Sequence, residues 1–200
     1  GSIIIPSYNR AHLLGETLDS VLAQTYKNWE CIVVDDDSND ATEELMEFYC
    51  ERDTRIQYYQ RPKDRKKGAN ACRNYGFNKS KGKFIQWYDS DDILHPQYLE
   101  KKISVKTIKS DLIISDTAVV GETNTSILKI FCNETNSERL LIDYSTWKVN
   151  LNLQAALWSI NIVKKYKFDE FLHRGQELEF HFRILSNENV KVFYVNEVLS

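Results

Sequence analysis

Residues 84–96 read FIQWYDSDDILHP, and this stretch shows how the chain is organised. Its first five residues are apolar or aromatic apart from one glutamine, which is typical of a buried β-strand. Three acidic residues then follow almost at once, at Asp89, Asp91 and Asp92. Pro96 opens a helix, because proline is tolerated in a first helical turn. The stretch is therefore a strand that ends on carboxylates and leads into a helix.

The same order of strand, polar turn and helix repeats on both sides of this stretch. Short apolar runs predict strands, and amphipathic runs between them predict helices. The expected strands are Ile3–Ile5, Glu30–Asp35, Ile56–Gln60, Phe84–Tyr88 and Asp111–Ser115, and the expected helices include residues 10–25 and Gly68–Lys79. Strands that alternate with helices at this spacing predict an α/β fold with a mostly parallel sheet.

Length and composition indicate a globular protein with one full-sized core. The chain has 200 residues, of which 42% are hydrophobic and 28% are charged. A net charge of −3 gives no electrostatic reason to expect nucleic acid as a ligand. The apolar runs are too short to cross a bilayer, and the four scattered cysteines do not form a zinc or disulfide pattern. We therefore expect a cytoplasmic protein.

The pattern changes after residue 116. Residues 117–150 predict irregular strands and polar loops, and order then returns with a helix from about Gly175 to Ser186 and a strand at Val190–Val198. We expect a single domain made of residues 1–200, with a first half at 1–116 and a smaller lobe at 117–200. We also expect this lobe to be truncated at its C-terminus.

Polar residues follow three of the expected strands, at 6–9, 35–37 and 89–92. Ligands of such sheets bind at the carboxyl ends of the strands. Asp89 and Asp91 are two residues apart, so that on an extended chain both side chains face one spot and favour a hard divalent cation, Mg²⁺ or Mn²⁺. The alternative is that residues 90–92 only cap the following helix.

Three further features have a functional and a simpler interpretation. Asp36, after the second strand, could accept hydrogen bonds from a base or a ribose, or it could belong to a polar turn. The basic run Arg65-Lys66-Lys67 precedes a helix and could bind a diphosphate, or it could be a solvated group of charges. Glu177 is expected in a first helical turn, where the dipole would lower its pKa and keep it ionised as a general base, or it could simply be a favourable charge.

Taken together, three segments resemble the family 2 glycosyltransferases, which are inverting enzymes with the GT-A fold. They are IIIPSYNRAHLLGETLDSVLAQTYKNWECIVVDDDSNDAT, GANACRNYGFNKSKGKFIQWYDSDDILHP and ALWSINIVKKYKFDEFLHRGQELEFHFRIL. The resemblance runs in order over almost the whole chain. It implies a nucleotide-sugar-binding half (1–116), an acceptor-side half (117–200), and a role in bacterial polysaccharide biosynthesis. The implied partners are a nucleotide-sugar donor, with a UDP-sugar favoured, and a saccharide or lipid-linked saccharide acceptor, in the cytoplasm or at the inner face of the cell membrane.

The resemblance also implies roles for individual residues. Pro6, Tyr8 and Asp36 would line the pocket for the base and ribose, with Lys67 beside the nucleotide. Asp89 would face the ribose and the metal, Asp91 would hold Mn²⁺ or Mg²⁺, and Asp92 would assist. Glu177 would be the base that deprotonates the acceptor hydroxyl.

One departure from the family pattern concerns the acidic pair before the last helix. It is commonly Glu-Asp, and here it is Gln176-Glu177. Glu179 is the fallback base, and Arg183 matches an arginine with a structural role. Two alternatives follow: a glycosyltransferase-like domain that binds a nucleotide sugar or scaffolds without turnover, and a haloacid dehalogenase-type phosphohydrolase built on Asp35-x-Asp37.

Overall fold

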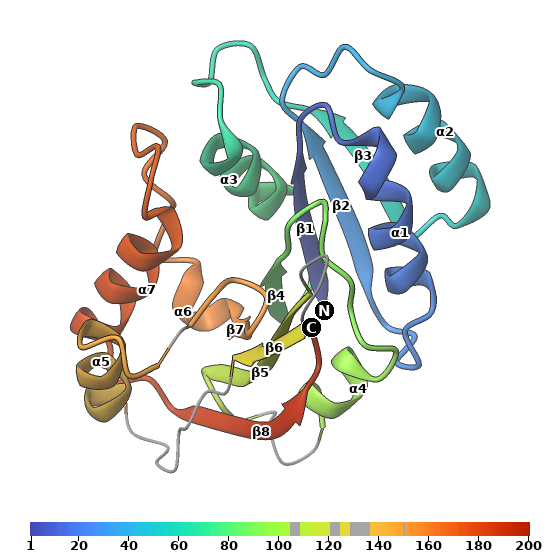
Figure 1. The fold of residues 1–200 in the computed structure, drawn as a ribbon. Helices are drawn as coiled ribbons and strands as arrows, with labels where there is room; N and C mark the ends of the chain where they lie inside the picture. Colours follow the sequence, from blue (N-terminus) through green and yellow to red (C-terminus); the bar gives the residue numbers. More distant parts are fainter. Residues whose placement is uncertain (105–108, 121–124, 129–136, 150) are drawn as a thin grey trace.

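The structure is a computed structural model that describes residues 1–104, 109–120, 125–128, 137–149 and 151–200. The strands in these residues are β1 (Ser2–Ser7), β2 (Glu30–Asp35), β3 (Ile56–Gln60), β4 (Phe84–Trp87), β5 (Leu112–Val120), β6 (Thr125–Leu128), β7 (Ala156–Ser159) and β8 (Val192–Val198). The helices are α1 (Ala11–Leu22), α2 (Thr42–Arg52), α3 (Ala69–Lys79), α4 (Tyr98–Lys102), α5 (Ser137–Ser145), α6 (Ile160–Val163) and α7 (Gln176–Asn187). Figure 1 shows their arrangement.

The strands form one mixed sheet in the order β3-β2-β1-β4-β7-β5-β6, and β8 pairs with β5. Strands β3, β2, β1 and β4 are parallel, and so are β5 and β8. Strand β7 is antiparallel to both of its neighbours, β4 and β5, and β6 is antiparallel to β5. The predicted α/β fold with a mostly parallel central sheet flanked by helices is confirmed.

Alternate residues of β1 face opposite sides of the sheet and pack into two cores. Ile3 and Ile5 pack with apolar residues of α1, α2 and α4. Ile4 faces the other way, into a core formed with α5, α6 and α7. Figure 1 shows α1 and α2 on one side of β1 and β2, with α3 and α7 on the other. Both faces of the sheet are covered, so that functional groups are left at its edges and ends.

Helix α3 lies close against the sheet because of one glycine. A Cβ atom added at Gly76 would come within 2.5 Å of Ile4 Cγ2 and 3.2 Å of Val34 Cγ2. Glycine therefore allows an approach that a larger residue would prevent. The close packing sets where α3 begins, beside the carboxyl ends of β1 and β2.

The observed elements differ from the predicted ones mainly in the second half. Strand β5 continues to Val120, and α5 lies in a region expected to be irregular. Leu140 and Tyr144, one helical turn apart, are buried in the core shared with α7, and this tertiary packing stabilises a helix whose local sequence is polar. The part of 117–150 at 121–124, 129–136 and 150 lies outside the described residues.

None of the helices described by the structure is both long and apolar enough to span a lipid bilayer.

Candidate active site

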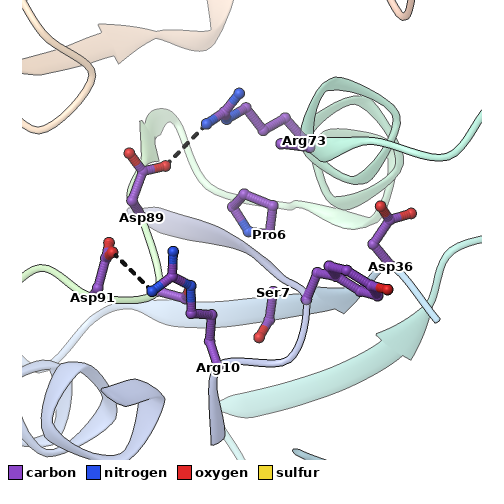
Figure 2. Close-up of a pocket in the computed structure, with 10 residues that line it drawn as sticks. Pro6, Ser7, Arg10, Asp36, Arg73, Asp89 and Asp91 are labelled. Atoms are coloured by element: carbon purple, nitrogen blue, oxygen red, sulfur yellow. Dashed lines mark hydrogen bonds and ion pairs between the residues drawn. The ribbon is translucent and has the colours of Figure 1, made fainter. Parts of the chain in front are cut away.

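The carboxyl ends of β1, β2 and β4 meet at one rim of the sheet, because the three strands are parallel. A cavity of about 360 Å³ opens there. It is lined by Pro6, Ser7, Tyr8, Arg10, Asp36, Ala69, Arg73, Asp89, Ser90 and Asp91. We call it the donor cavity. Figure 2 shows Asp89 and Asp91 on one side of it and Asp36 on the other. The structure thus brings together five of the predicted site residues.

Asp36 is held at this rim by a buried ion pair. Its Oδ1 atom accepts a hydrogen bond from Arg61 Nε, and both side chains are less than 10% exposed. Arg61 also donates to the carbonyls of Pro62 (3.0 Å) and Arg65 (2.6 Å), so the chain after β3 is tied to the same point. Asp36 is therefore a fixed anionic group in the wall of the donor cavity.

Tyr8 and Lys67 form a pair at the mouth of the cavity. The Lys67 ammonium lies 4.0 Å from the centroid of the Tyr8 ring, which is a cation–π contact. Tyr8 is 46% exposed, so its ring can also meet a ligand. Lys67 comes just before Gly68, the residue that precedes α3 and has a φ of 143°. The predicted basic run and the predicted tyrosine are thus neighbours in space.

Asp89 and Asp91 each lie beside an arginine. Arg73 of α3 donates from Nη2 to Asp89 Oδ1 at 2.9 Å, and Arg10 Nη1 lies 3.8 Å from Asp91 Oδ2, as Figure 2 shows. The acids follow the strand as expected, but the expectation of an extended chain through both of them is wrong, because β4 ends at Trp87 and Asp91 lies in a turn. Both carboxylates nevertheless line the same cavity, as the metal interpretation requires.

The carboxylates of Asp89 and Asp91 suit a hard cation that also binds ligands from outside the protein. No group of three or more His, Cys, Asp or Glu side chains that could hold a metal occurs in the described part of the chain. Mg²⁺ and similar ions are usually held by one or two carboxylates together with substrate phosphates. Asp91 is 43% exposed at its side chain, and its contact to Arg10 is long, at 3.8 Å, so it is accessible to an ion.

Asp92 points away from the donor cavity and meets the loop before β7. Its Oδ2 atom accepts a hydrogen bond from Gln154 Nε2, which also donates to Asp89 Oδ2 at 3.1 Å. Burial raises the pKa of Asp92 to about 6, against the effect of the Gln154 hydrogen bond and with help from the Asp89 charge. Gln154 therefore links two acids of the β4 loop to the second half of the chain.

A second cavity lies on the other side of Asp89 and contains Glu177. It is lined by Arg73, Asp89, Leu153, His173, Arg174, Gly175, Gln176 and Glu177. We call it the acceptor cavity. Gly175 precedes α7 with a φ of 63°, the left-handed conformation expected for a tight turn, and Glu177 falls in the first turn of α7. The two cavities share Arg73 and Asp89.

The prediction that the helix dipole lowers the pKa of Glu177 is wrong. Burial raises its pKa, the nearby charge of Asp89 raises it further, and the hydrogen bond from Leu153 N–H to Glu177 Oε2 (3.1 Å) opposes the shift. The desolvation of this carboxylate outweighs the favourable effect of its place in the first turn of α7. Glu177 is consequently a better proton acceptor than an ordinary glutamate.

Gln176 has a specific partner that explains why an amide fits at this position. Its Oε1 atom accepts a hydrogen bond from Arg73 Nη1 at 2.9 Å, and its Nε2 atom donates to the carbonyl of Leu172 at 2.9 Å. Arg73 also bonds to Asn70 Oδ1 at 3.0 Å. The departure from the family pattern is therefore accommodated by one buried arginine that joins α3, the β4 loop and α7.

Glu179, the fallback base, does not line either cavity. It forms an ion pair with Arg183 one turn later in α7, and Arg183 also donates to the carbonyl of Lys167 at 2.7 Å. This agrees with a structural role for Arg183.

The phosphohydrolase alternative does not fit, because Asp35, its required nucleophile, is 2% exposed and is bonded to Ser38 through both carboxylate oxygens.

Sequence reasoning missed the partners of these acids: Arg10, Arg61, Arg73 and Gln154. Arg73 had a detectable signal, because it is a charged residue among small residues in a helix that must pack on a sheet. Gln154 had a weaker one, as a polar residue directly before a buried run. Arg10 and Arg61 had none, because an arginine in a turn is usually solvated.

Comparisons with known proteins identify the family and relatives of this chain. Residues 2–139 match the sequence profile of Glycosyl transferase family 2. WfgD from Escherichia coli, a UDP-Glc:alpha-D-GlcNAc-diphosphoundecaprenol beta-1,3-glucosyltransferase, is 39% identical over 130 residues, which covers 60% of this chain and 49% of that protein.

Two solved structures share the fold. Staphylococcus aureus TarS (1–349) in complex with UDP superposes with a TM-score of 0.83 at 22% identity, covering 99% of this chain and 58% of that one. Mannosyltransferase PcManGT from Pyrobaculum calidifontis, in complex with GDP-Man and Mn²⁺, gives a TM-score of 0.68 at 15% identity, covering 99% and 55%. In each comparison the chain spans about half the length of the other protein. The chain belongs to glycosyl transferase family 2 and has its GT-A fold.

Proposed function

We propose that this chain moves a sugar from a nucleoside diphosphate sugar, with a UDP-sugar favoured, to an acceptor hydroxyl with inversion at the anomeric carbon. One observation carries the proposal: the donor and acceptor cavities share the Arg73–Asp89 pair. A nucleotide sugar whose base lies near Asp36 would extend toward Asp89. Its anomeric carbon would then lie next to the cavity that contains Glu177.

The donor is held by residues of the first half, which we propose as the nucleotide-sugar-binding half (1–116) of a single domain. Pro6 and Tyr8 form the surface against which the base and ribose pack, and Asp36 accepts hydrogen bonds through the oxygen that Arg61 leaves open. Lys67 supplies positive charge for the diphosphate. The name of WfgD, a relative that uses UDP-Glc and is 39% identical over 130 residues, supports the choice of nucleotide.

Asp91, together with Asp89, is proposed to hold Mn²⁺ or Mg²⁺. Their carboxylate oxygens are the ligands such ions prefer, and the remaining positions would be filled by the diphosphate and water. When bound, the ion offsets the negative charge that develops on the leaving nucleoside diphosphate. The Mn²⁺ in the PcManGT complex supports this assignment.

Glu177 is proposed to be the general base. It takes the proton of the acceptor hydroxyl, and the oxygen attacks the anomeric carbon from the face opposite the diphosphate. The bond from the anomeric carbon to the diphosphate oxygen breaks, and its electron pair leaves with the nucleotide. A base with a raised pKa drives this proton transfer better than an ordinary carboxylate does.

The acceptor is proposed to be a lipid-linked saccharide that lies along a groove next to Glu177. The groove is lined by Tyr144, Ser145, Trp147, Leu172, Arg174, Gly175, Leu178, Glu179, Phe182 and Arg183. It shares Arg174 and Gly175 with the acceptor cavity, so the two are continuous. Trp147 is 77% exposed, and an exposed aromatic surface suits sugar rings or an apolar chain. The name of WfgD, whose acceptor is a diphosphoundecaprenol-linked sugar, supports a lipid-linked acceptor in polysaccharide synthesis at the inner face of the membrane.

The proposal is tested by measuring UDP release and sugar transfer from a set of nucleotide sugars with Mn²⁺, for the wild type and for Glu177→Gln. We expect turnover in the wild type, loss of turnover in the variant, and unchanged UDP binding in both. The anomeric configuration of the product, read by NMR, would be inverted. Binding without turnover in the wild type would instead favour the scaffold alternative, and a retained configuration would contradict the single displacement.

A further inference from the structure

Three consecutive backbone carbonyl groups before β7 are each held by a different buried side chain. Gln86 Nε2 donates to Leu153 O (2.6 Å), the Tyr98 hydroxyl donates to Gln154 O (2.8 Å), and Lys102 Nζ donates to Ala155 O (2.6 Å). We call Gln86, Tyr98 and Lys102 the anchor cluster. All three side chains have 0% exposure. They come from β4 and α4, in the first half of the chain, and fix a segment of the second half.

The anchor cluster is bonded internally as well. The Tyr98 hydroxyl contacts Gln86 Oε1, and Lys102 Nζ lies 2.9 Å from the Tyr98 oxygen. Placing an amide, a phenol and an amine in a core is costly unless each one finds partners. Polar groups that are satisfied in this way allow one arrangement and penalise others. Residues 153–155 are thus set in position more strictly than apolar packing alone would require.

The opposite side of the same segment holds three carboxylates. Gln154 Nε2 donates to Asp89 Oδ2 at 3.1 Å and to Asp92 Oδ2. The backbone N–H of Leu153 donates to Glu177 Oε2 at 3.1 Å. The segment therefore touches acids from the β4 loop and from α7, which are the two sides of the proposed reaction.

The geometry points to Gln154 as a positioning residue that orients Asp89 for binding a divalent cation together with a nucleoside diphosphate, with the anchor cluster fixing Gln154. This inference rests on the proposed function. A side-chain amide has two N–H groups and no charge, so it can hold two carboxylates at once without neutralising either. Without it, Asp89 Oδ2 would lose the donor that, together with Arg73 at Oδ1, fixes the orientation of the carboxylate.

The test is the substitution Gln154→Met, which keeps the length of the side chain and removes its donors. Calorimetric titration of Mn²⁺ into the protein saturated with UDP gives the ion affinity without relying on turnover. We expect that affinity to fall by about 10- to 100-fold, the usual cost of losing a group that orients a metal ligand. UDP binding in the absence of Mn²⁺ and the Tm would stay close to wild type, because the Gln154 side chain bonds to Asp89 and Asp92, and its bond to Tyr98 is made by the backbone carbonyl, which the substitution keeps.

Gln57→Met is the matched control. Gln57 Nε2 also donates to a carboxylate, Glu30 Oε2 at 3.3 Å, but Glu30 lies at the start of β2, at the end of the sheet away from the cavities. The control should keep the wild-type Mn²⁺ affinity. A Gln154→Met protein with wild-type Mn²⁺ affinity would overturn the inference and leave the proposed function standing. A wild type that binds no Mn²⁺ with UDP would overturn the proposed function, and the inference with it.

Tyr98→Phe tests the anchor cluster separately. It removes the hydroxyl that holds Gln154 O and leaves the ring in place. We expect a lower Tm and also an Mn²⁺ affinity reduced by about two- to tenfold, the cost of one neutral hydrogen bond. A lower Tm with full Mn²⁺ affinity would show that the anchor cluster serves only the fold, which would overturn this part of the inference.

Discussion

The acids of the two halves of the site are held in different ways. In the first half, Asp36, Asp89 and Asp91 each lie beside an arginine: Arg61, Arg73 and Arg10. Glu177, on the acceptor side, has a backbone N–H as its partner, and Asp92, which is not among the residues that line either cavity, has the Gln154 amide. Hydrogen bonds from neutral donors do not offset the desolvation of a buried carboxylate. The pKa of each of these two acids is therefore raised.

The two kinds of partner allow one rim of the sheet to bind ligands and to accept a proton. A carboxylate held in place by an arginine is suited to binding ligands. A buried carboxylate with neutral partners is suited to taking up a proton. Arg73 lies at the boundary, where it pairs with Asp89 on one side and bonds to Gln176 on the other.

The substitution with the largest expected effect is Glu177→Gln, which tests the role of the acceptor-side acid. It removes the proton acceptor and keeps the shape of the side chain, so we expect the rate of sugar transfer to fall by about 100- to 10,000-fold. UDP affinity should be unchanged, because the donor cavity is not altered. Glu188→Gln is the matched control, since Glu188 follows the last residue of α7, is not among the residues that line the acceptor cavity or the groove, and pairs with Lys165. Equal losses in both variants would contradict the assignment of the base.

The corresponding change in the first half is Asp91→Asn. We expect the increase in UDP affinity caused by Mn²⁺ to shrink by more than about tenfold. Loss of a group that only orients a metal ligand often lowers metal affinity by that factor, and Asp91 is proposed to be a ligand itself. Isothermal titration with and without Mn²⁺ measures it. Asp37→Asn is the control: Asp37 is an exposed acid with a φ of 71°, and asparagine tolerates that conformation. An unchanged Mn²⁺ effect in Asp91→Asn would contradict the metal assignment.

The pH dependence sharpens the contrast between the two kinds of acid. Because the base must be ionised, kcat/KM should fall about tenfold per pH unit below the pKa of Glu177. Since burial raises that pKa, the midpoint should lie above the ordinary glutamate value of 4.5. The effect on stability has the opposite sign: protonation of Glu177 favours the folded state, so its contribution decreases as the pH rises through the raised pKa. A midpoint at or below 4.5, with the Tm constant over the range, would refute the raised pKa.

The smallest expected effect concerns the groove beside the acceptor cavity. Trp147→Ala removes its most exposed aromatic side chain, and we expect the KM for a lipid-linked acceptor to rise by about two- to tenfold while the KM for the donor is unchanged. Phe48→Ala removes another exposed aromatic, on α2, and should change neither KM. A rise in the donor KM of the Trp147 variant would contradict the assignment of the groove to the acceptor.

Much of the fold could be predicted from the sequence, because it follows from local patterns. The strands from β1 to β4 and the helices between them show clear periodicity, and the left-handed turn before α7 follows from Gly175. Helix α5 could not be predicted, since its helical state depends on Leu140 and Tyr144 meeting α7. The position of Glu177 in α7 was predicted correctly. The direction of its pKa shift was not, because the burial of Glu177 comes from contacts distant in sequence.

By itself, the sequence determined the alternation of strands and helices and the acids at the carboxyl ends of the strands. Both depend on residues within a few positions of one another. Only the tertiary structure decided which partner each acid has: Arg73 for Asp89 across 16 residues, and Gln154 for the same acid across 65. The reason is that ion pairing and desolvation depend on distance in space, and chain folding sets those distances through packing of the whole domain.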